Sequence, residues 1–298
     1  MSGFTNAVVV GAGTMGHGIA QVSAMSGIRV TLVDVESARV DAGLAQIEKN
    51  LAKGVEKGKL SAEQKATALA HLEGATTLDS LSRADLLVEA IPERMDLKKE
   101  LFRQADDHLP AHAILGSNTS SLSLTEMASA TKRPEQVIGL HFFNPVHIMK
   151  LLEIVRGAST SEETVQRALS LAETLGKTPV VVQDAPGFAT SRLGITLGNE
   201  AMRMVEEQVA SPADIDTAMK LGYGHPMGPL ALSDLVGLDV RFHITSALHE
   251  EIGTDGFRPP RILRKLVRAG HFGKKTGSGF YIWEDGKPIR PNPLAWRG

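Results

Sequence analysis

The sequence predicts an α/β protein in which a doubly wound, mainly parallel sheet is followed by an all-helical C-terminal domain. Apolar, strand-like runs alternate with helical patterns through the first 185 residues. Beyond residue 185 the strand signal fades and helical periodicity dominates. A Pro-Gly pair at residues 186–187 separates the two regions. We therefore expect a first domain at residues 1–185 and a second at residues 186–298.

Composition and charge exclude several classes of protein. The chain has 298 residues, of which 42% are hydrophobic and 22% are charged, and its formal net charge is −2. These values are typical of a soluble globular protein. Without a basic excess we expect no nucleic-acid partner, and without a long apolar run we expect no membrane span. The chain lacks cysteine and begins without a signal-peptide pattern, and both features favour a cytoplasmic location.

The rest of the chain is organised around its N-terminal segment. An apolar run at residues 7–10 stops at Gly11-Ala12-Gly13-Thr14-Met15-Gly16, and a helical pattern follows. A second apolar run, residues 28–33, ends at Asp34. This order of strand, G-x-G-x-x-G turn, helix, strand and acid predicts a Rossmann-type dinucleotide site. An isolated glycine-rich turn would carry no functional meaning, but here the flanking elements agree with it.

Each position of the motif has a physical reason. Gly11 allows the tight turn, Gly13 lets the backbone approach a pyrophosphate, and Gly16 lets the helix pack against the strand. The helix N-terminus offers unpaired N–H groups to the phosphates. Asp34 follows Gly11 by 23 residues (34 − 11), where a carboxylate can accept both ribose hydroxyls and repel a 2′-phosphate. We therefore expect NAD as the cofactor, in preference to NADP.

A long helical insertion follows this site. Apolar residues at helical spacing predict a helix over about residues 37–56, and Ser61 begins another helix as its N-cap. The stretch is longer than a crossover needs, so we expect a helical hairpin inserted into the first domain. Its far end is basic and includes Lys57. That end is either a solvated surface or a site for a ligand that carries phosphates.

The remaining elements follow the same alternation. Strand-like runs occupy about residues 84–90, 113–116, 137–143, 151–155 and 179–182. Helical periodicity in the second domain covers about residues 193–197, 213–221, 230–240 and 262–267. In an open α/β sheet, ligands bind outside the carboxyl ends of the strands. That rule directs the search for reactive side chains to the ends of these strands.

His141 lies at the late end of a strongly apolar strand. A lone histidine is usually structural, but this position favours a general base. Glu153 follows twelve residues later (153 − 141) on the next short strand. It could accept the second ring N–H of His141, or it could be a surface residue of an edge strand, and spacing alone does not decide. The polar cluster at residues 117–121 also follows a strand and suits a substrate oxygen. The sequence has no G-x-S-x-G elbow and no metal-ligand spacing.

With these motifs the chain resembles the 3-hydroxyacyl-CoA dehydrogenase family, particularly its bacterial 3-hydroxybutyryl-CoA members. The matching motifs cover nearly the whole chain in family order. They lie at residues 11–16, 88–93, 117–122, 141–145, 186–188, 225–229 and 272–277. Each motif alone is weak, but their joint occurrence is specific.

The resemblance implies a role for each matching position. His141 would take the proton of the 3-hydroxyl, with Glu153 as its partner. Ser120 and Asn144 would lie between the substrate and the nicotinamide. The other implied contacts are Glu93, Lys98 and Lys275 for NAD, and Asn50, Lys57 and Ser120 for CoA. The helical domain would complete the cleft and form the interface of a homodimer.

One position departs from the family pattern. The family usually has Pro-Gly-Phe-x-x-Asn-Arg, with the Asn reaching into the site, whereas this chain has Ser191 in its place. A serine keeps a donor and an acceptor but is shorter, so a water could bridge the gap. The departure bears on substrate pose and chain length more than on the reaction.

The function that follows is reversible hydride transfer between C3 of a short-chain (S)-3-hydroxyacyl-CoA, such as 3-hydroxybutyryl-CoA, and NAD. One alternative is a related dehydrogenase of a free hydroxy acid, similar to L-gulonate 3-dehydrogenase. The basic hairpin around Lys57 favours CoA instead. Another alternative is a catalytically silent NAD-binding protein, against which the presence of both His141 and Glu153 argues.

Overall fold

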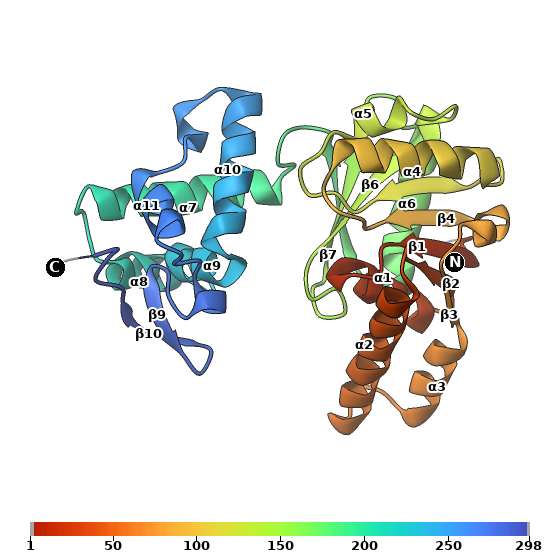
Figure 1. Ribbon diagram of the computed structural model, residues 1–298, viewed down its shortest axis with the longest axis horizontal. Helices are drawn as coiled ribbons and strands as arrows, with labels where there is room; N and C mark the ends of the chain where they lie inside the picture. The colour runs from red at the N-terminus through yellow and green to blue at the C-terminus, as the bar shows by residue number, and fades with distance from the viewer. Residues whose placement is uncertain (1–2, 297–298) are drawn as a thin grey trace. The chain divides into compact units, whose positions relative to one another are not determined.

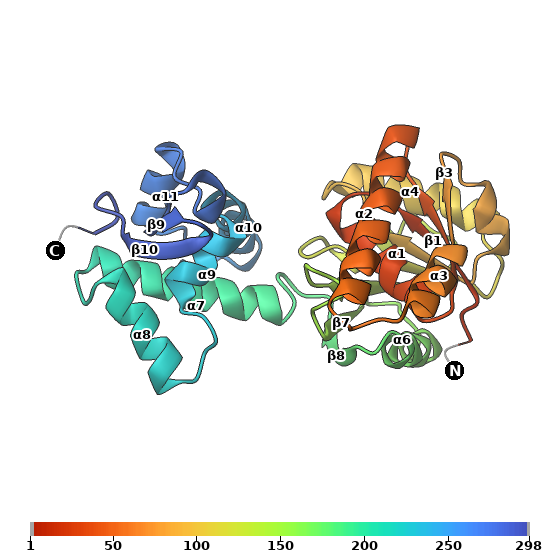
Figure 2. The same cartoon turned by 90° about the horizontal axis from the view of Figure 1, so that it is seen from below.

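The computed structural model describes residues 3–296. The chain divides into two compact units, Met1–Ala185 and Pro186–Gly298. The first unit is an α/β unit and the second is mainly helical (Figures 1 and 2). This confirms the predicted fold class.

The first unit is built on an eight-stranded sheet within the described residues, in the order β3-β2-β1-β4-β5-β6-β7-β8. The strands are β1 Asn6–Val10, β2 Arg29–Val33, β3 Leu72–Ala75, β4 Leu86–Glu89, β5 Ile114–Ser117, β6 Val137–Phe142, β7 Leu151–Arg156 and β8 Thr178–Gln183. Neighbours pair in parallel except β6 and β7, which are antiparallel. The chain runs outward from β1 to β3 and then crosses back to β4, so the strand order reverses between β1 and β4. That reversal is where an open α/β sheet forms its ligand crevice.

Strand β3 was not predicted, because its sequence gives little apolar signal. It is an edge strand whose four residues, Leu72–Ala75, are half-buried or exposed. By contrast, every residue of β4 and β5 is buried. Strands in the middle of a parallel sheet are covered on both faces, so they appear as continuous apolar runs. Edge strands lack that signature.

The helices of the first unit cover the sheet and bury its apolar residues. They are α1 Thr14–Met25, α2 Ser37–Glu56, α3 Ala62–Ala70, α4 Met95–His108, α5 Leu124–Ala128 and α6 Glu162–Thr174, with short 3-10 turns at Asp79–Arg83 and Pro134–Gln136. Helices α2 and α3 form the expected hairpin (Figure 1). Ser61 begins α3 with a capping box, in which its hydroxyl accepts from the Gln64 amide and the Gln64 side chain accepts from the Ser61 amide.

The second unit is helical, as predicted, and also contains a two-stranded antiparallel hairpin that the prediction omitted. Its helices are α7 Thr190–Glu206, α8 Pro212–Gly222, α9 Pro229–Val236, α10 Leu238–Ile252 and α11 Arg261–Arg268, with 3-10 turns at Asp255–Phe257 and Lys274–Thr276, and its strands are β9 Tyr281–Glu284 and β10 Lys287–Pro291. Between the strands, Asp285 and Gly286 have φ of 48° and 75°. An Asp-Gly pair with positive φ at both positions is a strong hairpin signal, so this element could have been predicted.

Two buried carboxylates fasten this hairpin to the helices. Asp234 of α9 is fully buried and accepts hydrogen bonds from the Phe280 and Tyr281 amides at 2.8 and 2.9 Å and from Trp283 Nε1 at 2.9 Å. Asp216 of α8 accepts from the Tyr281 hydroxyl at 2.8 Å and also from amides at the start of α9. Burial raises the pKa of Asp234 to about 6, although the three donors oppose the shift. The hydrogen bonds compensate part of the cost of removing the carboxylate from water.

In the first unit, Asp85 fastens the start of the chain to the sheet. Its Oδ2 accepts from the Thr5 amide at 2.7 Å, the Thr5 hydroxyl at 2.8 Å and the Asn6 amide at 3.0 Å, and its Oδ1 lies 3.1 Å from His112 Nε2. Partial burial opposes ionisation, but these donors outweigh it and lower the pKa of Asp85 to about 2. The ionised carboxylate therefore stabilises the folded state.

We expect Asp85→Asn to lower the free energy of unfolding by about 1–2 kcal/mol at pH 7. Because the pKa of Asp85 falls from 3.8 to about 2 on folding, its contribution is complete above pH 4 and is lost as the pH falls toward 2. Urea unfolding of the parent and the variant at pH 7 and pH 3 measures this. A difference in stability that stays constant between the two pH values would contradict the assignment.

Candidate active site

The glycine-rich turn between β1 and α1 is shaped by contacts with its own backbone. Gly11 has φ of +103°, and a Cβ added there would lie 2.5 Å from the Ala90 carbonyl oxygen. A Cβ on Gly16 would lie 1.6 Å from the Gly11 carbonyl oxygen. At Gly13, by contrast, a Cβ would meet no atom within 4 Å. The fold itself therefore requires Gly11 and Gly16, whereas Gly13 faces open space in which a ligand can approach the backbone.

Beside this turn lies a groove of about 750 Å³. Its walls come from the turn with Thr14 and Met15, from Asp34 at the end of β2, from residues 90–92 after β4, and from Leu97 and Leu101 of α4. The Asp34 carboxylate accepts a hydrogen bond from the Ala12 amide at 2.8 Å, which holds it against the turn. The N-terminus of α1, capped by Gly13 without any side-chain hydrogen bond, opens at the same place. An anionic dinucleotide fits such a groove, with phosphates at the helix N-terminus and a ribose at Asp34.

His141 and Glu153 are brought together by the antiparallel pair in the sheet. The register of β6 and β7 places the two residues directly opposite each other. His141 Nδ1 lies 2.7 Å from Glu153 Oε2, and the two residues are 7% and 0% exposed. The His141 ring also packs against Phe143, with centroids 4.5 Å apart. A buried carboxylate in this position fixes the orientation of the ring, so that Nδ1 faces Glu153.

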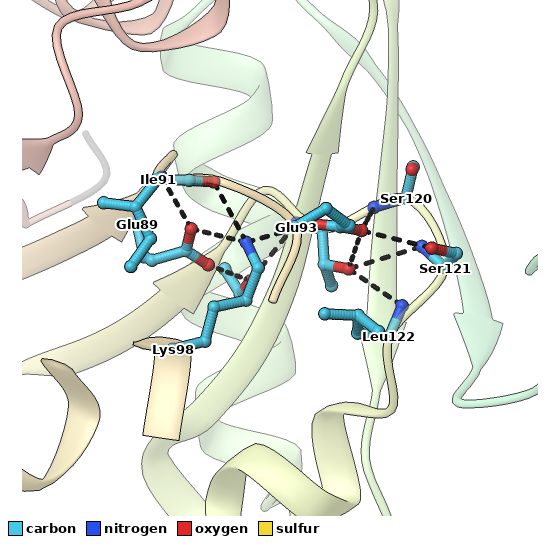
Figure 3. Close-up of polar contacts among 9 residues, drawn as sticks. Glu89, Ile91, Glu93, Lys98, Ser120, Ser121 and Leu122 are labelled. Atoms are coloured by element: carbon cyan, nitrogen blue, oxygen red, sulfur yellow. Dashed lines mark hydrogen bonds and ion pairs between the residues drawn. The ribbon is translucent and has the colours of Figure 1, made fainter. Parts of the chain in front are cut away.

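The polar segment after β5, residues 118–122, is held by Glu93. Glu93 Oε1 accepts from Thr119 Oγ1 at 2.5 Å, from the Ser120 amide at 3.0 Å and from Ser121 Oγ at 3.2 Å. The Ser120 hydroxyl points away from Glu93 (Figure 3). Burial raises the pKa of Glu93, but the charge of Lys98 and hydrogen bonds from Thr119, Lys98 and the Ser120 amide outweigh this and lower it overall. Glu93 is thus an anion at neutral pH.

Lys98 is buried beside the segment that follows β4. Its side chain is 1% exposed, and its Nζ lies 2.5 Å from Glu89 Oε1 and 3.1 Å from Glu93 Oε2. Glu89, to which the sequence pattern assigns no role, is fully buried at the end of β4. The available signal was a charged residue closing an apolar strand, with an acid four residues on and a lysine nine residues on.

The end of β6 is tied to its surroundings by two further residues without an assigned role. Asn118 Oδ1 accepts from the Phe142 amide at 2.9 Å, which links the serine segment to the strand of His141. Buried Lys177 donates to the carbonyl oxygens of Val146 and Met149 in the turn that follows Asn144. Asn144 itself is exposed on that turn. Burial lowers the pKa of Lys177, and the charge of Lys150 lowers it further.

The hairpin residues differ in their surroundings. The Asn50 amide nitrogen donates to Gln21 Oε1 at 3.0 Å, and its oxygen accepts from Gln46 Nε2 at 2.9 Å. Lys57 is exposed at the C-cap of α2. Positive charge gathers near this helix: burial lowers the pKa of His147, and the charges of Lys177, His17, Lys53 and Lys59 lower it further. The region suits an anionic ligand group.

The two remaining predicted positions belong to the second unit. Ser191 lies in the first turn of α7 and is half-buried. Lys275 Nζ lies 2.7 Å from the Asp239 carboxylate and is about half exposed.

Within residues 3–296, no cluster of His, Cys, Asp or Glu side chains has the arrangement of a metal site. None of the helices described for this chain is both long and apolar enough to cross a membrane.

Comparison with known proteins gives consistent matches over both units. Residues 6–185 match the 3-hydroxyacyl-CoA dehydrogenase NAD binding domain, and residues 187–283 match the C-terminal domain of the same family. A probable 3-hydroxybutyryl-CoA dehydrogenase of Bacillus subtilis is 48% identical over 278 residues, covering 93% of this chain and 97% of the relative. The crystal structure of (S)-3-hydroxybutyryl-CoA dehydrogenase PaaH1 from Ralstonia eutropha is similar with a TM-score of 0.92 and 41% identity, covering 95% of this chain and 100% of that one.

The glycines of the turn allow a matched test. We expect Gly13→Ala to change the free energy of unfolding by no more than about 1 kcal/mol, since the position is an N-cap with open space around it. Its methyl group should nevertheless raise the Kd for NADH at least about tenfold, because it occupies the path of the pyrophosphate. Gly16→Ala should instead destabilise the fold, by about 1–3 kcal/mol or more.

Urea unfolding and fluorescence titration with NADH measure the two effects separately. Parental NADH affinity in Gly13→Ala would show that the pyrophosphate does not pass this glycine. Parental stability in Gly16→Ala would show that the close contact with Gly11 is relieved by a small shift of the turn.

Proposed function

Since the chain belongs to the 3-hydroxyacyl-CoA dehydrogenase family, we propose that it transfers a hydride reversibly between C3 of a short-chain (S)-3-hydroxyacyl-CoA and NAD. The protein is an NAD-dependent oxidoreductase. The named relatives include a 3-hydroxybutyryl-CoA dehydrogenase, and we propose 3-hydroxybutyryl-CoA and acetoacetyl-CoA as the substrate pair. The observation that carries this proposal is the buried pair of His141 and Glu153.

The pair supplies the acid–base half of the reaction. Oxidation of the alcohol to a ketone removes the hydroxyl proton and a hydride from C3. His141 Nε2 takes the proton, because Nδ1 faces Glu153 at 2.7 Å. The imidazolium that forms is costly in a buried site, and the carboxylate of Glu153 offsets that cost. In the reverse direction His141 returns the proton to the ketone oxygen.

Bound NAD supplies the hydride acceptor, and the residues present fit it. We propose that Asp34 accepts the ribose hydroxyls and that residues 11–16 receive the pyrophosphate, supported by the open space at Gly13 and by the groove beside it. The other proposed cofactor contacts are Glu93, Lys98, Ser120, Asn144 and Lys275. The burial of Lys98 favours an indirect role through Glu93. Ser191 and Ser120 would take polar groups of the substrate.

We propose that CoA is recognised by the helical hairpin. Asn50 and Lys57 are the proposed contacts, together with Ser120. The positive charge around His147 supports this placement, because CoA carries a pyrophosphate and a 3′-phosphate. A free hydroxy acid carries one carboxylate and no phosphate, so the positive charge favours CoA over it.

Assembly and location are parts of the same proposal. We propose a homodimer formed through the second unit, where Leu193, Leu221 and Tyr223 are 71%, 83% and 79% exposed. Contiguous exposed apolar surface is typical of interaction sites, and these side chains are our candidates for it. We also propose a cytoplasmic location, which the absence of cysteine favours.

Turnover decides between this proposal and its alternatives. We expect NADH oxidation with acetoacetyl-CoA at a kcat/KM at least about a hundredfold above that with free acetoacetate, because binding energy from the CoA portion is used at the reacting carbon. NADPH should be a much poorer donor, given the carboxylate of Asp34. Faster turnover of L-gulonate with NAD would support the free hydroxy acid instead, and absence of any turnover with NADH bound would support the silent protein.

The acid–base pair makes a separate prediction. His141→Gln should lower kcat by about 10²–10⁴, and Glu153→Gln by a smaller factor, while NADH binding stays near normal. The double variant should be little worse than His141→Gln, because partners that act as one unit are not additive. His108→Gln, a histidine exposed at the end of α4, is the control and should leave kcat unchanged. If the two losses multiply in full, the residues act independently and the pairing is wrong.

A further inference from the structure

Glu89 is a fully buried carboxylate that the acid–base reaction does not use. It ends β4, and the strand register places it beside Val10 on one side and Ser117 on the other. It therefore lies at the carboxyl edge of the sheet, next to the point where the strand order reverses. A buried charge is costly unless it is paired and hydrogen-bonded. Its contacts show what the charge is used for.

The carboxylate of Glu89 holds two segments at once. Its Oε1 accepts from the Ile91 amide at 2.8 Å and from Lys98 Nζ at 2.5 Å. Its Oε2 accepts from Ser117 Oγ at 2.5 Å, and that hydroxyl in turn accepts from the Thr119 amide at 3.2 Å. Residues 90–93 after β4 and residues 118–122 after β5 are thus fixed relative to each other.

Lys98 extends this arrangement to Glu93, whose side chain is 38% exposed. It lies between Glu89 and Glu93, and Glu93 binds the Ser120 amide (Figure 3). The sequence of contacts is therefore Glu89, Lys98, Glu93 and the backbone of Ser120. One cation serves two anions, so the cluster carries a net negative charge and needs the donors from the serine segment.

The position of the cluster indicates which part of a dinucleotide it faces. Asp34 directly follows β2, on one side of the reversal point, and is the proposed ribose contact. A dinucleotide that crosses this point places its other half beyond β4 and β5. Glu93 and Ser120 lie there, and Asn118 connects their segment to the strand of His141.

A purely structural role is the alternative for these charges. Buried ion pairs, however, add little net stability, because desolvation cancels much of the attraction. The main effect of these charges is geometric, since the carboxylate of Glu89 fixes residues 90–93 and residues 118–122 relative to each other. We propose that Glu89 is a positioning residue, which acts through Lys98 and Ser117 to orient Glu93 and Ser120 toward the nicotinamide half of NAD. This inference rests on the proposed function only for its effect on turnover.

The test compares two ligands that differ at the nicotinamide. ADP-ribose contains the adenosine, the pyrophosphate and the second ribose of NADH and lacks only the nicotinamide ring. In Glu89→Gln we expect kcat with acetoacetyl-CoA to fall about ten- to a hundredfold, as small misplacements at a reacting centre do. The Kd for NADH should rise while the Kd for ADP-ribose stays at the parental value. A loss of general stability would weaken both ligands equally.

Ser117→Ala is the second variant and removes only one hydroxyl from Glu89, without changing any charge. It should show the same pattern with a smaller fall in kcat, and it decides the question if Glu89→Gln does not fold. Glu126→Gln is the matched control, because Glu126 pairs with Lys99 at 3.3 Å on the surface. It should leave kcat and both Kd values unchanged.

Two results would overturn the proposal. The first is that the variants lose affinity for NADH and for ADP-ribose equally. The second is that Ser117→Ala, and Glu89→Gln if it folds, keep the parental kcat and NADH affinity. Glu89→Gln/Lys98→Met removes both buried charges together. If it regains parental kcat, the pair only balanced its own charge and the proposal is wrong. If the parent does not act on acetoacetyl-CoA, the proposed function fails, and the ratio of NADH to ADP-ribose affinities still tests the role of Glu89.

Discussion

The close approach of backbone to backbone at the glycine turn is the constraint on which the rest of the first unit depends. Gly16 of α1 lies against the Gly11 carbonyl, and Gly11 lies against the Ala90 carbonyl. No side chain fits at either contact, so the backbones of β1, α1 and the segment after β4 touch directly. Because these three segments are fixed together, the residues that follow the strands at the carboxyl edge of the sheet have fixed relative positions. Asp34, Glu93 and the serine segment are placed relative to one another in this way.

The antiparallel pair of β6 and β7 supplies what a wholly parallel sheet would not. In an antiparallel pair, side chains of opposed residues on the same face lie close together. His141 and Glu153 use this geometry, and the buried environment makes their interaction strong. The imidazole of His141 is therefore carried by a strand and not by a loop. Lys177 and Asn118 hold the turn and the segment that flank it.

The fold was largely predictable because its central strands are covered on both faces and leave continuous apolar runs. Edge strand β3 gave no such signal, and the hairpin of the second unit required attention to Asp285-Gly286 instead of apolar periodicity. In the site, spacing alone left Glu153 undecided between a partner of His141 and a surface residue, since only the register of two strands shows that they face each other. The role of Glu89 could not be predicted, because buried charges are rare and a sequence does not show which charged residues are buried. The hydrogen bonds of Glu89 come from Ile91, Lys98 and Ser117, which lie 2, 9 and 28 residues further along the chain.

The hydrogen bond from the Ala12 amide to Asp34 gives one side chain two tasks in the proposed cofactor site. The carboxylate that we propose distinguishes the two nicotinamide dinucleotides also binds the backbone of the glycine-rich turn. Selectivity and turn geometry therefore cannot be altered separately at this residue. Replacing Asp34 to admit a 2′-phosphate would also remove the hydrogen bond that holds the turn at Ala12, where we propose that the dinucleotide binds. A change of cofactor in this scaffold would need a compensating acceptor for the Ala12 amide, and a lineage that evolved one would have to acquire both changes together.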